Sequence, residues 1–333
     1  MKRRTIGLSV AVGAGFLAAF LFACGNSAPK EGNSSPTAAQ PAQAAAPAVA
    51  PSDALPPDKT GGFDGARAFD HVAKLVAIGP RPPDSDGIHR EQEYIHTQLK
   101  SFGCPVEDDD FHASTPIGSV AMKNIVAKIP GNSPDMILLM THYDTLKKEG
   151  FVGAEDSASS TGLMLEMARL LCPKKQHLGV WIAFVDGEEA FVDWNTDNDN
   201  TYGSRQLAAR MALADELKHV KALILADMIG QKDPHFERDS NSTGWLVNLV
   251  WSTAAKLGYQ EIFVSREAAT EDDHLSFTSR HVASVDIIDL NDYIQLGYWH
   301  TSEDTLDKVS ARSIGIVGHV ILATIDDLQS RPR

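Results

Sequence analysis

Two short runs of continuously apolar residues, each followed by acidic residues, constrain the fold most. Residues 180–185 are followed by Glu188 and Glu189, and residues 222–226 run into Asp227. A strand without a polar face is buried on both sides, which requires helices over both faces of a sheet with a parallel centre. In such sheets ligands bind at the carboxyl ends of the strands. The acids that follow these runs are therefore expected to lie at a functional site.

Segments with the helical spacing of apolar residues alternate with strand-like runs. The expected helices are 65–78, 88–102, 157–171, 204–217, 245–257 and 312–328. The expected strands are 120–129, 136–140, 180–185, 222–226 and 284–288, the first two flanking a turn at 130–132. No internal repeat or second low-complexity break interrupts residues 63–333. We therefore expect one α/β domain with a mixed central β-sheet, parallel core strands and helices on both faces.

The first 62 residues differ in composition from the rest. Residues 1–24 have a basic start, an apolar run and a lipoprotein cleavage box ending in Cys24, so we expect a signal peptide and a lipid on Cys24. A plain signal peptide, an anchor helix and a twin-arginine signal are the alternatives. Residues 25–62 are rich in Ala, Pro and Ser and are expected to be a disordered tether. The protein is predicted to be exported to the periplasm and anchored by lipid to a bacterial membrane, the outer rather than the inner one.

Charge and cysteine content narrow the expected partners. The formal net charge is −14 and the predicted domain has no basic cluster, which argues against binding of nucleic acid. We expect a monomer.

Besides Cys24, the chain contains Cys104 and Cys172. These two could pair in an oxidising compartment, but we favour two free thiols, since sequence does not give the distance between their Cα atoms.

Several potential ligands and acids stand at or just after predicted strand ends: His142, Asp144, Asp156, Glu188, Glu189, Asp227 and His300. Because the carboxyl ends of parallel strands share one edge of a sheet, we expect these side chains to converge. Three His or carboxylate ligands with an open fourth position are typical of catalytic zinc, and an adjacent acid can transfer protons. The non-catalytic alternatives are an exposed acidic turn at Glu188 and Glu189, a loop histidine at His300 and a helix N-cap at Asp156.

Five short blocks carry a resemblance to a known family. They are residues 151–158, 186–191, 202–205, 272–274 and 299–301. In this order they resemble the zinc-dependent glutaminyl cyclases, which share a superfamily with the zinc aminopeptidases. The resemblance implies one zinc per chain bound by Asp156, Glu189 and His300, with Glu188 as the general acid/base. The implied substrates are peptides or proteins with an N-terminal Gln, which becomes pyroglutamate with release of ammonia.

The resemblance also assigns residues around the metal. It implies that Asp227 and Asp272 form a hydrogen-bonded pair that supports proton transfer. It places Trp194 and Trp299 at the substrate pocket. One position departs from the pattern, because Asp286 stands where animal members of the family have a His. The segment 291–298 is longer than theirs and is expected to be a loop at the rim of the pocket.

Two other functions compete with this one. In a two-zinc aminopeptidase, His142 and Asp227 would bind a second metal ion and Asp156 would bridge the two. A lipid-anchored binding protein without activity is the third possibility, against which the intact Glu188 argues. The number of metal ions per chain separates the first two.

Overall fold

The computed structural model describes residues 53–196 and 198–331 of the chain. The predicted signal peptide, the lipidation site at Cys24 and most of the predicted tether lie outside the described residues. Within these two ranges, no helix combines the length and the apolar character that crossing a membrane requires.

A mixed sheet of six strands in the order β1-β2-β4-β3-β5-β8 forms the centre of the fold. The strands are β1 (Val106–Thr115), β2 (Gly118–Ile129), β3 (Met136–His142), β4 (Gly179–Val185), β5 (Val220–Asp227) and β8 (Ser284–Ile288). Strand β3 is parallel to β4 and to β5, and β5 is parallel to β8. Strands β1 and β2, and β2 and β4, pair antiparallel. The expected parallel centre is confirmed, and an antiparallel hairpin extends it at one edge.

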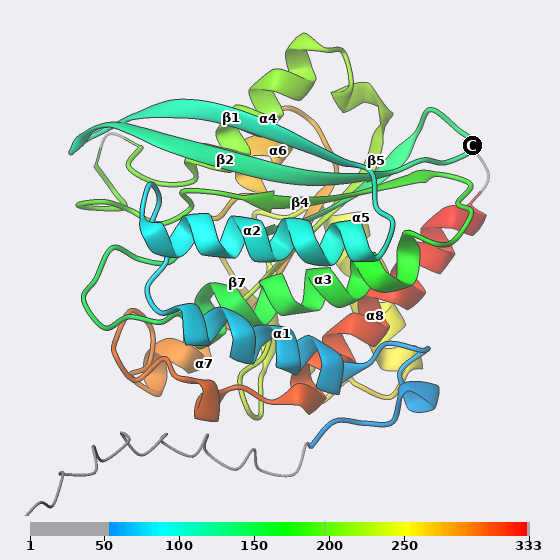
Figure 1. Cartoon of the computed structure of the whole chain (residues 1–333). Coiled ribbons are helices and arrows are strands. Elements are labelled where there is room, and N and C mark those ends of the chain that lie inside the picture. Colours follow the sequence, from blue (N-terminus) through cyan, green and yellow to red (C-terminus); the bar gives the residue numbers. More distant parts are fainter. Residues whose placement is uncertain (1–52, 197, 332–333) are drawn as a thin grey trace, which may run out of the picture. The chain divides into compact units, whose positions relative to one another are not determined.

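Helices cover both faces of this sheet. They are α1 (Gly65–Ile78), α2 (Asp86–Ser101), α3 (Ser160–Leu171), α4 (Tyr202–Leu213), α5 (Gly244–Lys256), α6 (Leu275–Thr278), α7 (Leu290–Gln295) and α8 (Ala311–Ser330). Figure 1 shows α1, α2, α3 and α8 on one face and α4 and α6 on the other. Alternate residues of β4 enter the two cores: Val180 and Ile182 pack with the first group of helices, Ala183 and Val185 with the second. Burial on both faces explains why residues 136–140 of β3, 180–185 of β4 and 222–226 of β5 are apolar.

Some elements differ from those expected. Strand β1 is an edge strand with mostly exposed acidic and polar residues, so it lacks the apolar run that predicts a buried strand. Strands β6 (Phe236–Asp239) and β7 (Phe263–Ala268) form a small separate sheet. Strands β2 and β3 do not pair with each other, because β4 lies between them. The segment 291–298 contains most of α7 rather than a loop throughout.

The expectation of two free thiols was wrong. Cys104, just after α2, and Cys172, just after α3, form a disulfide with their Cα atoms 5.2 Å apart. The two helices pack side by side through the same apolar core. Residues 68 positions apart in the chain are thereby brought together, a proximity that no local sequence pattern encodes.

The fold also begins before residue 63. The carboxylate of Asp53 accepts hydrogen bonds from the Ser310 hydroxyl at 2.6 Å and the Arg312 N–H at 3.2 Å, at the N-terminus of α8. Thr60 is fully buried, and Leu55 packs against the main core. Residues 53–62, which the composition assigned to the tether, therefore belong to the folded domain.

Candidate metal centre and active site

The sheet brings the acidic residues to one edge. His142 ends β3 and Asp227 ends β5, while Glu188 and Glu189 follow the end of β4. Because β4, β3 and β5 are adjacent and parallel, their carboxyl ends meet there. All four residues are at least nine-tenths buried. The exposed acidic turn considered for Glu188 and Glu189 is therefore excluded.

Asp156, Glu189 and His300 form a compact group of potential ligands. One ligand atom from each lies within 4.8 Å of the others. The Nε2 atom of His300 is 3.4 Å from an Asp156 carboxylate oxygen and 3.2 Å from one of Glu189. Both Glu189 oxygens are buried and neither accepts a well-aligned hydrogen bond, so the ion-pair contact with His300 is the polar contact that the Glu189 carboxylate makes in the described structure. Two carboxylates and one imidazole are a ligand set of the catalytic zinc type, and these buried oxygens fit a bound cation.

His142, Asp156 and Asp227 form a second group of this kind, which shares Asp156 with the first. The Nε2 atom of His142 is 3.0 Å from Asp227 and 3.2 Å from Asp156. In the described ranges, these two groups are the sets of three or more ligands found close enough for a metal ion. The geometry thus accommodates the one-metal and the two-metal interpretations.

The electrostatics of the first group favour a positive charge between the carboxylates. Burial, and then the charge of Asp156, raise the pKa of Glu189 to about 7. Burial alone would lower the pKa of His300, but its contacts with Asp156 and Glu189 raise it to about 10. For Asp156, burial is outweighed by hydrogen bonds with His142 and His300, which hold its pKa below the ordinary range. Buried carboxylates in contact need a cation, and a metal ion would supply it.

The chain around Glu188 and Glu189 is held by another carboxylate. Asp144 is fully buried, and its two oxygens accept hydrogen bonds from the Glu188 N–H at 3.0 Å and the Glu189 N–H at 3.3 Å. Gly187, just before them, has φ +69°, a conformation that favours glycine. Asp144, expected among the potential ligands, therefore supports the backbone of this turn instead.

Asp156 lies in an irregular segment before α3. The helix expected from residue 157 begins at Ser160, after a turn at Ala154–Ser159 in which Asp156 has non-helical backbone angles. The fully buried Arg81 donates hydrogen bonds to the carbonyl oxygens of Val152 at 2.7 Å and Gly153 at 3.2 Å. Its guanidinium also pairs with Glu91 at 2.6 Å. The simple N-cap considered for Asp156 is not observed, because its side chain contacts His142 and His300 instead.

Three further acids face the same region. Burial raises the pKa of Glu188 well above its ordinary value. Burial, and then the charge of Asp227, raise the pKa of Asp272. One Asp272 oxygen is buried without a hydrogen-bond partner, and no direct hydrogen bond between Asp227 and Asp272 is formed in the described structure. Asp286, at the position that departs from the animal pattern, is fully buried, and the charge of Asp272 adds to the effect of burial in raising its pKa.

A cavity of about 530 Å³ contains the predicted residues. Asp156, Glu188, Glu189, Asp227, Asp272, Trp194, Trp299 and His300 all line it. Trp299 stacks on His300 with ring centroids 4.0 Å apart and is 37% exposed. Nearby, Asp199 organises the loop that carries Trp194 by accepting hydrogen bonds from three successive backbone N–H groups. Both tryptophans are thus walls of the pocket.

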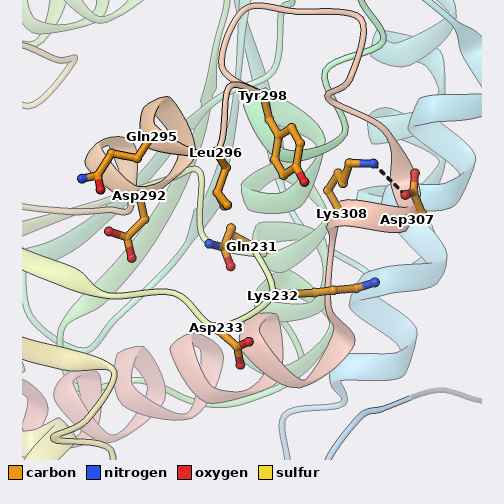
Figure 2. Close-up of a pocket in the computed structure, with 9 residues that line it drawn as sticks. All are labelled: Gln231, Lys232, Asp233, Asp292, Gln295, Leu296, Tyr298, Asp307 and Lys308. Carbon is orange, nitrogen blue, oxygen red and sulfur yellow. Dashed lines mark hydrogen bonds and ion pairs between the residues drawn. The ribbon is translucent and has the colours of Figure 1, made fainter.

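A larger cavity of about 710 Å³ lies elsewhere, lined by Gln231, Tyr298, Lys308 and their neighbours (Figure 2). It contains none of the clustered acids. The functional site is therefore assigned to the cavity that holds the ligands and the tryptophans.

Residues 124–325 match Peptidase family M28. This chain belongs to family M28. Among its relatives, a glutaminyl-peptide cyclotransferase of Drosophila melanogaster is 31% identical over 66% of this chain and 68% of the relative. A glutaminyl-peptide cyclotransferase-like protein of Bos taurus is 30% identical over 68% of this chain and 66% of the relative.

Solved structures show the same fold. A glutaminyl cyclase from an Acidobacteriales bacterium matches with a TM-score of 0.76 and 37% identity, over 86% of this chain and 99% of the other. A glutaminyl cyclase from Porphyromonas gingivalis matches with a TM-score of 0.75 and 29% identity, over 80% of this chain and 99% of the other. A Zn-dependent exopeptidase from Parabacteroides distasonis matches with a TM-score of 0.72 and 26% identity, over 81% of this chain and 99% of the other. The predicted superfamily and fold class are confirmed.

Proposed function

We propose that this M28 protein is a glutaminyl-peptide cyclotransferase that uses one zinc ion per chain. The observation that carries the proposal is the group Asp156, Glu189 and His300, with Glu188 beside it, in a pocket walled by tryptophans. The relatives named as glutaminyl cyclases favour this reaction over peptide hydrolysis. The substrates are peptides or proteins whose N-terminal residue is Gln.

Asp156, Glu189 and His300 would hold the zinc, which acts as a Lewis acid on the γ-carbonyl group of the substrate when bound. Glu188 accepts a proton from the attacking α-amine and returns it to the departing ammonia. Its position directly before a ligand keeps its carboxylate near the reacting atoms. Because the ring closure is intramolecular, these residues contribute mainly orientation and proton transfer.

The remaining residues of the pocket complete the site. One carboxyl group of the pair Asp227 and Asp272 stays protonated, because burial raises the pKa of both and two buried carboxylates that interact cannot both be ionised at low cost. This proton lets Asp227 hold the amide nitrogen of the substrate. Trp194 and Trp299 exclude water, which otherwise hydrolyses the amide.

The alternative is a two-zinc aminopeptidase, which the group His142, Asp156 and Asp227 favours. Zinc content of the purified protein, saturated with zinc and then freed of loosely bound metal, distinguishes the two. One tightly bound zinc per chain supports the cyclotransferase. Two bound ions, together with release of amino acids from peptides, would replace it with the aminopeptidase.

We also propose that the protein is a monomer, exported and held at a bacterial membrane by lipid on Cys24. The Cys104–Cys172 disulfide supports export, since such bonds persist in oxidising compartments. Metabolic labelling with a radioactive fatty acid tests the anchor, because Cys24→Ala removes the acceptor thiol. The wild type should carry the label and Cys24→Ala should not. A wild-type protein without label would contradict the lipid anchor.

A further inference from the structure

The segment that carries Asp156 has backbone groups that its own structure does not satisfy. At Asp156 the chain has φ −112° and ψ 88°, outside helical values. Glu155 and Asp156 are both buried, so their N–H groups need acceptors within the protein. A single side chain provides both. The carboxylate of Asp304 accepts from the Glu155 N–H at 2.8 Å and from the Asp156 N–H at 3.2 Å.

Asp304 belongs to the segment that carries another predicted ligand. It lies four residues after His300, and its own N–H donates to the carbonyl of Thr301 in the turn between them. Its carboxylate accepts a third hydrogen bond, at 2.7 Å, from the hydroxyl of Tyr293 on α7. Asp304 is fully buried. One carboxylate thus connects the backbone at Asp156 to the turn that follows His300.

His300 has few other restraints on its backbone. It has φ +53°, in the left-handed region, and lies outside any helix or strand. Its carbonyl accepts a hydrogen bond from the Lys148 ammonium group at 2.8 Å, a contact at the exposed surface. The side chain of His300 contacts Asp156 and Phe151, but the buried hydrogen bonds that join the backbone at Asp156 to the segment after His300 run through Asp304. Removing the carboxylate would leave two buried N–H groups unpaired, so the segments would shift to regain partners.

We propose that Asp304 is a positioning residue that fixes Asp156 relative to His300 and thereby sets the affinity of the site for zinc. Metal ligands act well only when the groups behind them hold their geometry, and loss of such a group typically weakens metal binding roughly 10- to 100-fold. The inference rests on the zinc ligands of the proposed function but does not depend on the reaction that the zinc supports.

Competition with a chromogenic zinc chelator, on the purified full-length protein, tests this inference. Asp304→Ala should raise the Kd for zinc roughly 10- to 100-fold. Asp304→Asn keeps one acceptor oxygen but turns an amide N–H towards a backbone N–H, so its Kd should rise several-fold. Tyr293→Phe removes one hydrogen bond to the carboxylate and should have the smallest effect. Asp307→Asn is the matched control, because Asp307 is exposed in the same segment and its carboxylate accepts hydrogen bonds from Thr305 and Lys308, outside the ligand group.

Circular dichroism of the zinc-free proteins, recorded during unfolding, separates a positioning role from a merely structural one. A positioning residue changes the Kd for zinc in variants whose spectrum in the folded state matches that of the wild type. If Asp304→Ala does not fold, Asp304→Asn and Tyr293→Phe decide the question. If the Kd for zinc of both variants lies within twofold of that of the Asp307→Asn control, the inference is overturned, while the proposed reaction is left intact. Graded loss of affinity in a protein that releases no ammonia would support the inference and refute the reaction.

Discussion

At the scale of single residues, Glu188 and Glu189 are adjacent in the chain but face different neighbours. The Glu189 carboxylate lies 3.2 Å from Nε2 of His300. The nearest histidine to the Glu188 carboxylate is His142, whose Nδ1 is 3.9 Å away. The turn after β4, held by Asp144, directs the two side chains apart. One acid is thereby available as a ligand and the other as a proton carrier.

This division predicts the effect of replacing the proton carrier alone. Glu188→Gln should retain one zinc but lose at least 100-fold in kcat, because the amide cannot accept a proton. Glu271→Gln is the matched control, since Glu271 lines the same cavity at its exposed rim. Zinc content and steady-state rates measure both effects. Turnover of Glu188→Gln within a few-fold of the wild type would show that another group transfers the proton.

His71 predicts a pH dependence of stability away from the site. It is 7% exposed on α1, and its Nδ1 is 2.7 Å from the hydroxyl of Tyr94 on α2. Burial, and then the charges of Arg67 and Arg169, lower its pKa from 6.5 to about 4. The unfolded chain therefore binds a proton more readily than the folded one between pH 6.5 and 4. Stability from this residue is present above pH 6.5 and is lost as the pH falls to 4.

The loss should amount to about 2–3 kcal/mol, and urea unfolding at pH 7 and pH 4.5 measures it. His71→Gln keeps an acceptor for Tyr94 but does not titrate, so it should lose less stability than the wild type over this range. His112→Gln, at an exposed position on β1, is the control and should behave as the wild type. Equal pH dependence in His71→Gln and the wild type would refute the assignment.

At the scale of elements, close packing of α1 against α8 depends on Gly65, the first residue of α1. A Cβ atom built on Gly65 would lie 2.3 Å from the Ala311 carbonyl oxygen and 3.1 Å from the Gly315 Cα atom, both on α8. These are backbone atoms, so a side chain at this position would force the two helices apart.

Gly65→Ala should therefore destabilise the protein by about 1–3 kcal/mol. Gly244→Ala is a close control, because Gly244 also begins a helix, α5, and its Cβ atom would have no neighbour within 4 Å. That substitution should be neutral or slightly stabilising. Denaturant midpoints of the two variants give the comparison, and equal midpoints would contradict the role of Gly65.

The disulfide between the ends of α2 and α3 makes a separate prediction. It closes a loop of 68 positions. The loss of entropy in the unfolded chain should then stabilise the folded state by about 4 kcal/mol. The double variant Cys104→Ala/Cys172→Ala should lose stability of this order, and the wild type in reductant should behave similarly. A loss below about 1 kcal/mol would mean that the cross-link contributes little.

At the scale of the whole molecule, the core strands and the helices between them could be predicted because burial on both faces leaves a continuous apolar run. Strand β1 could not, since an exposed edge strand carries acidic residues that resemble a loop. The edge of the sheet where His142, Glu189 and Asp227 meet followed from the parallel topology. The supporting acids Asp144 and Asp304 could not be recognised as supports, because they act through backbone N–H groups of distant segments.

The site therefore depends on the complete domain rather than on any one motif. Asp156 precedes α3, Glu189 follows β4, and His300 follows α7. Only the sheet order places β3, β4 and β5 side by side, and only the chain after α7 returns His300 to the same edge. A fragment without the last third of the chain would lack His300 and is expected to bind zinc weakly.

The most direct test of the central claim is an ammonia-release assay on a peptide that begins with Gln, run beside a chromogenic aminopeptidase substrate. We expect zinc-dependent release of ammonia with formation of an N-terminal pyroglutamate, and no comparable cleavage of the aminopeptidase substrate. Cleavage of the aminopeptidase substrate by the zinc-loaded enzyme, with no ammonia from the Gln peptide, would contradict the account.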